Sequence, residues 1–217
     1  MPSPLLRSPL LWFSAAFFAA LAWSAVHPAD SFTWWLEVFP ALLGYAVLIA
    51  VARRWQFTTF VLVVILLHML VLMVGGHYTY AGVPGFRFNL SWLGGDRNDY
   101  DKLGHFFQGF APALVAREVL SRKQIVRTRG WMNFLVVALC LGISAAYELV
   151  EWAVSVATGS GGDAFLGTQG YLWDTQSDML FALIGATVAV LAFGRLQDGI
   201  LRRSFPDMTG IKPSQRT

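Results

Sequence analysis

The chain contains the run QFTTFVLVVILLHMLVLMVG at residues 56–75, twenty residues without a single acid, lysine or arginine. A helix needs about 20 predominantly apolar residues to cross the hydrocarbon core of a bilayer. A surface helix of a soluble domain carries polar residues along one side instead. This segment therefore predicts a transmembrane helix.

The rest of the chain has the same character. Charged residues make up 13% of the sequence and hydrophobic residues 56%, with a mean hydropathy of +0.54, whereas soluble domains are about 25% charged. We predict an all-α, polytopic membrane bundle of six helices in one domain, residues 1–203. The spans are predicted at 9–26, 33–52, 56–75, 103–121, 131–157 and 177–197, followed by a disordered cytoplasmic tail at 204–217.

The basic residues gather on one side of this topology. Thirteen of the 16 lie before the first span, between the second and third, between the fourth and fifth, or at and after the end of the sixth. The positive-inside rule then places both termini in the cytoplasm of a bacterial inner membrane. The net charge of +3 is explained by this distribution, so we expect the lipid bilayer and no nucleic acid as partner. If the first span were a cleaved signal peptide, the other five would keep their orientation.

Three polar patterns lie at the predicted outer ends of the last three spans. Asp101 and His105 are four residues apart, and Glu148 and Glu151 are three apart, so each pair shares one face of a helix. In the third pattern, DTQSD at 174–178, we expect Asp174 to cap the sixth helix while Asp178 faces the bundle.

Because these patterns share one depth, they can converge on an outward-facing pocket of acids and a histidine. Ionisable groups inside a span are costly and are therefore functional candidates. Several chemistries fit: a proton relay, recognition of an amine or sugar headgroup, or a lock between helices. A divalent metal is a possible cofactor, with His105, Asp101, Glu148, Glu151 and Asp178 as hypothetical ligands.

Two other spans carry polar residues. His68 lies in the middle of the third span, where we expect it to face the bundle and form a hydrogen bond. Glu37 lies in the second span near Pro40, a pair that suggests a kink with a polar partner nearby. The bases at the end of the fourth span, including Arg122, are interpreted as topology determinants near anionic lipid.

Five segments carry a family resemblance: TWWLEVFP (33–40), LMVGGHYTYA (72–81), RNDYDKLGHFFQGFAPALVARE (97–118), YELVEW (147–152) and FLGTQGYLWDTQSDM (165–179). In these strings the chain resembles the YjdF-like family of bacterial inner-membrane proteins. The likeness extends over about residues 10–200. It implies topology and location, and no biochemical activity.

A more distant similarity is to VanZ-like membrane proteins, which carry an Asp-Lys-x-x-His string at the start of one helix. Asp101, Lys102 and His105 match that string, while Glu148 and Glu151 depart from the more varied polar residues of the later helix. VanZ-like proteins are associated with resistance to a glycopeptide antibiotic, which suggests an envelope-facing role.

Three classes of function stay open on the sequence. The first is a membrane-embedded enzyme, metal- or acid/base-dependent, acting on a lipid or lipid-linked envelope precursor through the candidate residues Asp101, His105, Glu148, Glu151, Asp174 and Asp178. The second is a protein that binds or transports a cation, an amine or a proton. The third is a structural protein. No nucleotide or redox cofactor is expected, and the sequence does not fix the oligomeric state.

Overall fold

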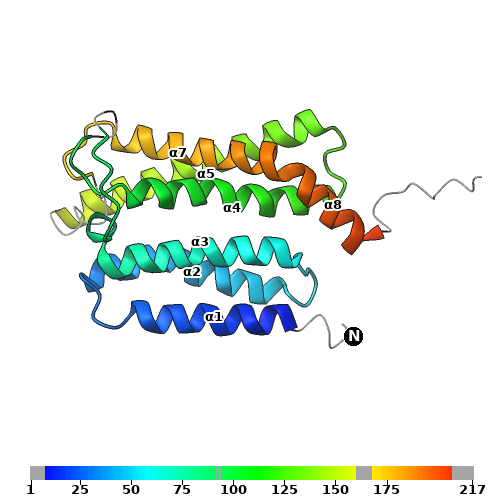
Figure 1. The fold of residues 1–217 in the computed structure, drawn as a ribbon, viewed down its shortest axis with the longest axis horizontal. Helices are drawn as coiled ribbons and strands as arrows, with labels where there is room; N and C mark the ends of the chain where they lie inside the picture. The colour runs from blue at the N-terminus through cyan, green and yellow to red at the C-terminus, as the bar shows by residue number, and fades with distance from the viewer. Residues whose placement is uncertain (1–7, 91, 93, 160–167, 207–217) are drawn as a thin grey trace, which may run out of the picture.

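A computed structural model describes residues 8–90, 92, 94–159 and 168–206, and these residues form an all-helical bundle (Figure 1). The long helices are α1 (Ser8–Ser24), α2 (Ser31–Val51), α3 (Thr59–Tyr78), α4 (Tyr100–Arg122) and α5 (Arg129–Thr158). The final helix of the bundle is continuous and comprises α7 (Asp174–Val188), the π-helical segment η5 (Ala189–Phe193) and α8 (Gly194–Ser204). A short 3₁₀ turn, η2 (Tyr80–Gly82), follows α3. The predicted fold class is confirmed.

Four of the described helices are long and apolar enough to cross a membrane: α2, α3, α5 and the continuous helix from Asp174 to Ser204. The last extends beyond the predicted end at residue 197. Of the two remaining helices, α1 has only 17 residues, and α4 has 23 but carries several charged side chains. The predicted tail begins at residue 204, the last of α8, and residues 207–217 lie outside the described part.

The charged side chains of α4 are tolerated because this helix is surrounded by protein. It packs against α3, α5 and α7, whereas α3 joins it to the pair α1 and α2 (Figure 1). Its contact with α7 is especially close. A Cβ added at Gly109 would overlap the carbonyl of Ala182, and one at Gly185 would overlap the carbonyl of Phe106. Such small residues let two membrane helices approach backbone to backbone.

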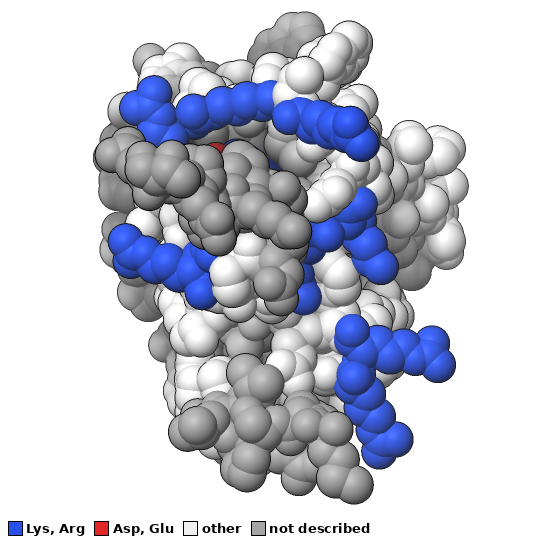
Figure 2. Space-filling view, turned by 90° about the vertical axis from the view of Figure 1, so that its right-hand side faces the viewer, with Lys and Arg blue, Asp and Glu red and all other residues white. Residues whose placement is uncertain are grey.

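The two ends of the bundle differ in charge. At one end, which we call the basic end, α2 is connected to α3, α4 to α5, and α8 terminates (Figure 1). Figure 2 views this end and shows lysine and arginine side chains spread over it. Its exposed members include Arg54, Lys123, Arg129 and Arg203. The opposite end, where α4 and α7 begin and α5 terminates, is called the acidic end.

Candidate functional site

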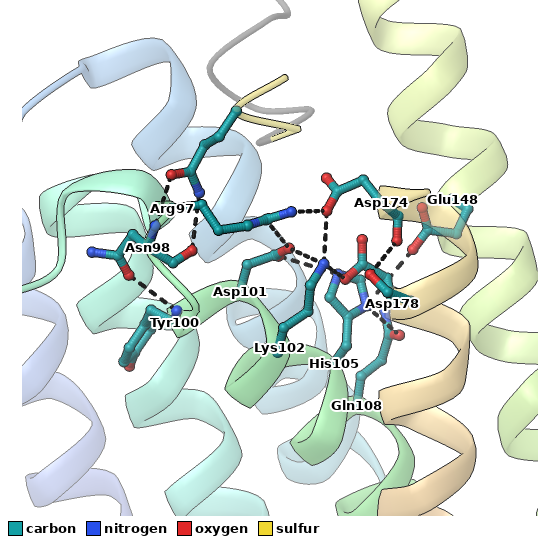
Figure 3. Close-up of polar contacts among 12 residues, drawn as sticks. Arg97, Asn98, Tyr100, Asp101, Lys102, His105, Gln108, Glu148, Asp174 and Asp178 are labelled. Carbon is teal, nitrogen blue, oxygen red and sulfur yellow. Dashed lines mark hydrogen bonds and ion pairs between the residues drawn. The ribbon is translucent and has the colours of Figure 1, made fainter. Parts of the chain in front are cut away.

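The three polar patterns of the sequence meet at the acidic end (Figure 3). The first turns of α4 and α7 lie side by side there, because the glycine contacts hold these helices together. Their carboxylates are buried, and α5 brings Glu148 and Glu151, also buried, to the same region. The expectation that these segments lie near one another therefore agrees with the structure.

Lys102 occupies the centre of this arrangement, with only 2% of its surface exposed. Its Nζ lies 3.2 Å from Asp101 Oδ2, 2.7 Å from Asp174 Oδ1 and 2.5 Å from Asp178 Oδ1. The expectation that Asp174 caps the last helix was wrong. Asp174 is the first residue of α7, Trp173 is the N-cap residue and has no side-chain cap bond, and the Asp174 carboxylate turns to the bases instead.

Arg97 completes the group that we call the Lys102 network: Arg97, Asp101, Lys102, Asp174 and Asp178. Its Nη1 donates to Asp174 Oδ1 at 2.5 Å, and its Nη2 lies 3.4 Å from Asp101 Oδ2. Burial opposes the charge of Arg97, but its hydrogen bond to Asp174 and the neighbouring carboxylates outweigh burial and raise its pKa. Three buried carboxylates thus share two permanent cations.

The segment that carries Arg97 is held by backbone contacts from distant parts of the chain. The Asn98 backbone N–H donates to Gln169 Oε1 at 2.9 Å, and Gln169 Nε2 donates back to the Asn98 carbonyl at 3.0 Å. The Asn98 side chain donates to the Val83 carbonyl. The segments before α4 and before α7 are therefore fastened to each other at this end.

His105 lies one turn deeper in α4 and faces carboxylates on both sides of its ring (Figure 3). Its Nε2 is 3.3 Å from Asp101 Oδ1 and 3.7 Å from Asp178 Oδ1, while its Nδ1 is 3.7 Å from Glu148 Oε1. Glu148 Oε1 is buried and has no hydrogen-bond partner among the described residues. Because Asp101 and Asp178 share one nitrogen and Glu148 faces the other, the hypothetical metal ligands do not surround one centre.

Below the network lies a cavity of about 160 Å³, which we call the acidic cavity. Its polar lining is contributed by α2, α3, α4, α5 and η2: Glu37, His68, Tyr80, Asp101, His105, Gln108, Tyr147 and Glu151. No lysine or arginine is among the residues that line it. The volume exceeds the roughly 30 Å³ that one water occupies in the liquid, so a small ammonium group fits within it.

Glu37 and Tyr80 were not predicted as site residues, although Glu37 was expected to have a polar partner. Both side chains line the acidic cavity. The tyrosine ring fits against Gly75 of α3 and Gly104 of α4, where an added Cβ would clash with it. In the sequence, Gly75 and Gly104 gave only a weak signal of this tyrosine site. Their role becomes clear only once it is known that α3 and α4 pack together.

A second buried polar group lies at the basic end, and we call it the Glu118 network. Glu118 accepts hydrogen bonds from the Thr58 backbone N–H at 3.1 Å, the Thr58 hydroxyl at 2.7 Å and Arg122 Nη1 at 3.0 Å. Beside it, Arg117 Nη1 donates to Asp198 at 2.9 Å and to the Gly194 carbonyl. The sequence interpretation treated Arg122 as a topology determinant near anionic lipid and predicted no partner for Arg117 or Arg122.

These features define a polytopic α-helical membrane protein with a buried, acid-rich cavity near one end. The family described as "Predicted membrane protein (DUF2238)" matches residues 9–199, and the chain belongs to this family. The inner membrane protein YjdF of Escherichia coli (strain K12) is 51% identical to the chain over 184 residues, covering 84% of this chain and 88% of that protein. No solved structure matches. The chain is thus an inner-membrane protein of the family that its sequence resembles.

Proposed function

We propose that the protein binds a cationic amine group in its acidic cavity, on the outward-facing side of the inner membrane. One observation carries this proposal. The Lys102 network, the cavity and the adjacent Glu148 together contain six buried carboxyl groups, of Glu37, Asp101, Glu148, Glu151, Asp174 and Asp178, against two permanent cations. The imbalance lies on the cavity side, which holds no base other than histidine.

Burial makes this imbalance significant. An isolated charge away from water costs several kcal/mol even after relaxation, so excess buried carboxyl groups must acquire protons or a cation. An ammonium group supplies the positive charge together with up to three N–H donors. Glu37, Asp101, Glu151 and the Gln108 carbonyl oxygen offer acceptors around one small volume. Binding of an amine is therefore favoured over binding of an anion.

The outward orientation rests on the distribution of bases. Exposed lysines and arginines gather at the basic end, which the positive-inside rule assigns to the cytoplasm, together with both termini. Topology reporters fused after Arg54, Leu90 and Thr128 test it. We expect Arg54 and Thr128 inside and Leu90 outside; Leu90 inside or Thr128 outside would overturn the orientation.

A divalent metal at Asp101, His105 and Asp178 is the second candidate, since these residues offer ligand atoms within 4.8 Å of one another. Such a metal would fit an enzyme that acts on a lipid-linked envelope substrate, with Glu148 or Glu151 as base. The position of Lys102 argues against it. The ammonium lies 2.5 Å from Asp178 Oδ1, and a metal on the same carboxylate would place a second cation close to it, so that the two would repel each other.

Ligand binding separates the two candidates. The protein in nanodiscs of phosphatidylglycerol, a lipid without an amine, is titrated with ethylammonium or with Mn²⁺ while thermal unfolding is followed. We expect ethylammonium to stabilise the wild type and to lose most of its effect in Glu151→Gln and in Glu37→Gln. Asp96→Asn, which removes an exposed acid of the same end, serves as the control.

Stabilisation by Mn²⁺ that disappears in Asp178→Asn and persists in Glu151→Gln would support the metal instead. No stabilisation by either cation would contradict the proposal of a cation site.

A further inference from the structure

An open apolar groove of about 830 Å³ runs from the acidic cavity toward the basic end. Its walls come from α2 and α3 on one side and from α4 and α5 on the other, with Val47, Met69, Val115 and Leu139 among its members. The groove forms because α2 packs on α3 and makes no comparable contact with α4 or α5 among the described residues.

The groove and the acidic cavity are continuous. Five residues line both of them: Pro40, His68, Leu72, Pro112 and Ile143. The two prolines lie inside α2 and α4. Each lacks the N–H that a helix would use to bind the carbonyl four residues earlier, so acceptors are left at Leu36 and Gln108 near the junction. A single molecule can thus place a polar end in the cavity and an apolar end in the groove.

The length of the groove suits one hydrocarbon chain. Along α4 it extends from Ala111 to Leu120 and along α2 from Pro40 to Val51, which is about 14–17 Å at the helical rise of 1.5 Å per residue. This equals about half of a 30 Å hydrocarbon core. Trp55 lines the far end, and its ring is covered by the Arg122 guanidinium at 3.8 Å.

The route into the groove is lateral. Figure 3 shows Arg97 and Asp174 at the outer side of His105 and Gln108, and the network residues are buried there. Leu43, Val47 and Leu139 line the groove and are half exposed on the helix surface that faces lipid. A molecule dissolved in the bilayer can therefore reach the cavity without crossing the Lys102 network.

From this continuity, and resting on the amine site proposed above, we infer that the ligand is an amine-bearing membrane lipid, with its ammonium headgroup in the acidic cavity and one hydrocarbon chain in the apolar groove. Lipid tails are as apolar as the groove, so the chain gains little on entering it. The headgroup supplies the affinity, through charge-assisted hydrogen bonds to the carboxylates. The groove selects a ligand whose hydrocarbon chain is attached close enough to the ammonium group to lie in the groove while that group occupies the cavity.

The test uses a long-chain primary amine with a photoreactive diazirine in the middle of its chain, in phosphatidylglycerol nanodiscs. Adducts are mapped by peptide mass spectrometry. We expect groove residues to be labelled about tenfold more than other lipid-facing residues. A factor of about ten corresponds to the free energy of one charge-assisted hydrogen bond between the amine and the cavity. Probes of equal length that end in a carboxylate or an alcohol should show no such enrichment.

Val47→Trp fills the groove, and Val150→Trp is the matched control. The two valines are 54% and 53% exposed, but only Val47 lines the groove. We expect Val47→Trp to abolish the enrichment and Val150→Trp to leave it unchanged, with stabilisation by ethylammonium intact in both variants.

Even labelling of all lipid-facing residues, or labelling insensitive to Val47→Trp, would overturn the groove as the chain site while leaving the amine site in place. Equal enrichment for the carboxylate probe would overturn an amine-bearing lipid as the ligand. Failure of ethylammonium to stabilise the protein is the separate result that removes the amine site itself.

Discussion

The two buried polar groups of this bundle differ in how their charges are matched. In the Glu118 network, two carboxylates face two arginines, and Glu118 receives three donors while fully buried. Around the Lys102 network and the acidic cavity, six buried carboxyl groups face two permanent cations, Glu148 Oε1 has no hydrogen-bond partner among the described residues, and a cavity lies alongside.

The difference separates a structural role from a binding role. A network with as many arginines as carboxylates fastens helices and has no excess charge to offer a further ligand. A network with excess acids beside an open volume is incomplete without protons or a cation. The Lys102 network contains elements of both, because Lys102 and Arg97 join α4 to α7 while the carboxylates on the cavity side stay unmatched.

Removing the central cation should have the largest effect. Lys102→Met leaves three buried carboxylates with Arg97 as their one permanent cation, so we expect a loss of about 3–5 kcal/mol in the free energy of unfolding. Unfolding in mixed detergent micelles measures it. Arg87→Met removes the base of an exposed pair and should change stability by less than about 1 kcal/mol. Equal losses in the two variants would contradict a central role for Lys102.

The close contact between α4 and α7 is the next test. Gly185→Ala places a Cβ against the Phe106 carbonyl, so the helices must separate and the protein should lose roughly 1–3 kcal/mol. The separation also weakens the pairing of Lys102 with Asp178. Gly142→Ala on α5 adds a Cβ with no neighbour within 4 Å and should leave stability unchanged or slightly higher. The same unfolding assay compares them.

One isosteric change applied at both ends sharpens the comparison directly. Glu118→Gln removes the charge from a saturated acceptor and should cost about 1.5–3 kcal/mol. Glu151→Gln removes an excess acid from the cavity, so without ligand its stability should equal or exceed that of the wild type. Thermal unfolding in amine-free nanodiscs measures both. A comparable loss in Glu151→Gln would show that the cavity acids are as well matched as Glu118.

The smallest expected effect lies outside both networks. Asp30 precedes α2 and accepts the Thr33 backbone N–H at 2.7 Å, a contact that lowers its pKa. A lowered folded pKa means that the contribution is present above the unfolded pKa of about 3.9 and is lost as the pH falls through the folded value. Asp30→Ala should cost about 1 kcal/mol at neutral pH. Asp30→Asn keeps the cap and should abolish this part of the pH dependence, which acid titration of stability detects.

The sequence predicted the helices and the meeting of three polar patterns well, because apolar length and charge distribution are local properties. The equal depth of Asp101, His105, Glu148 and Asp178 needed only the helix order. The role of Lys102 was missed because its partners on α7 lie more than 70 positions along the chain, and adjacency to Asp101 does not indicate them.

The contribution of α2 was missed for a related reason. Glu37 reaches the cavity only because α2 and α3 pack against each other and Tyr80 fits between Gly75 and Gly104. Periodicity within one helix cannot specify which neighbour covers which face. The groove likewise depends on how little α2 contacts α4 and α5 among the described residues.

The excess of acids in the acidic cavity is tested most directly by infrared difference spectroscopy of the carboxyl bands on adding ethylammonium to nanodisc-embedded protein. We predict that protonated carboxyl absorption decreases and carboxylate absorption increases as the amine replaces protons, and that the change is absent in the double variant Glu37→Gln/Glu151→Gln. Bands that do not change in the wild type, or that change equally in the double variant, would contradict an amine-binding acidic cavity.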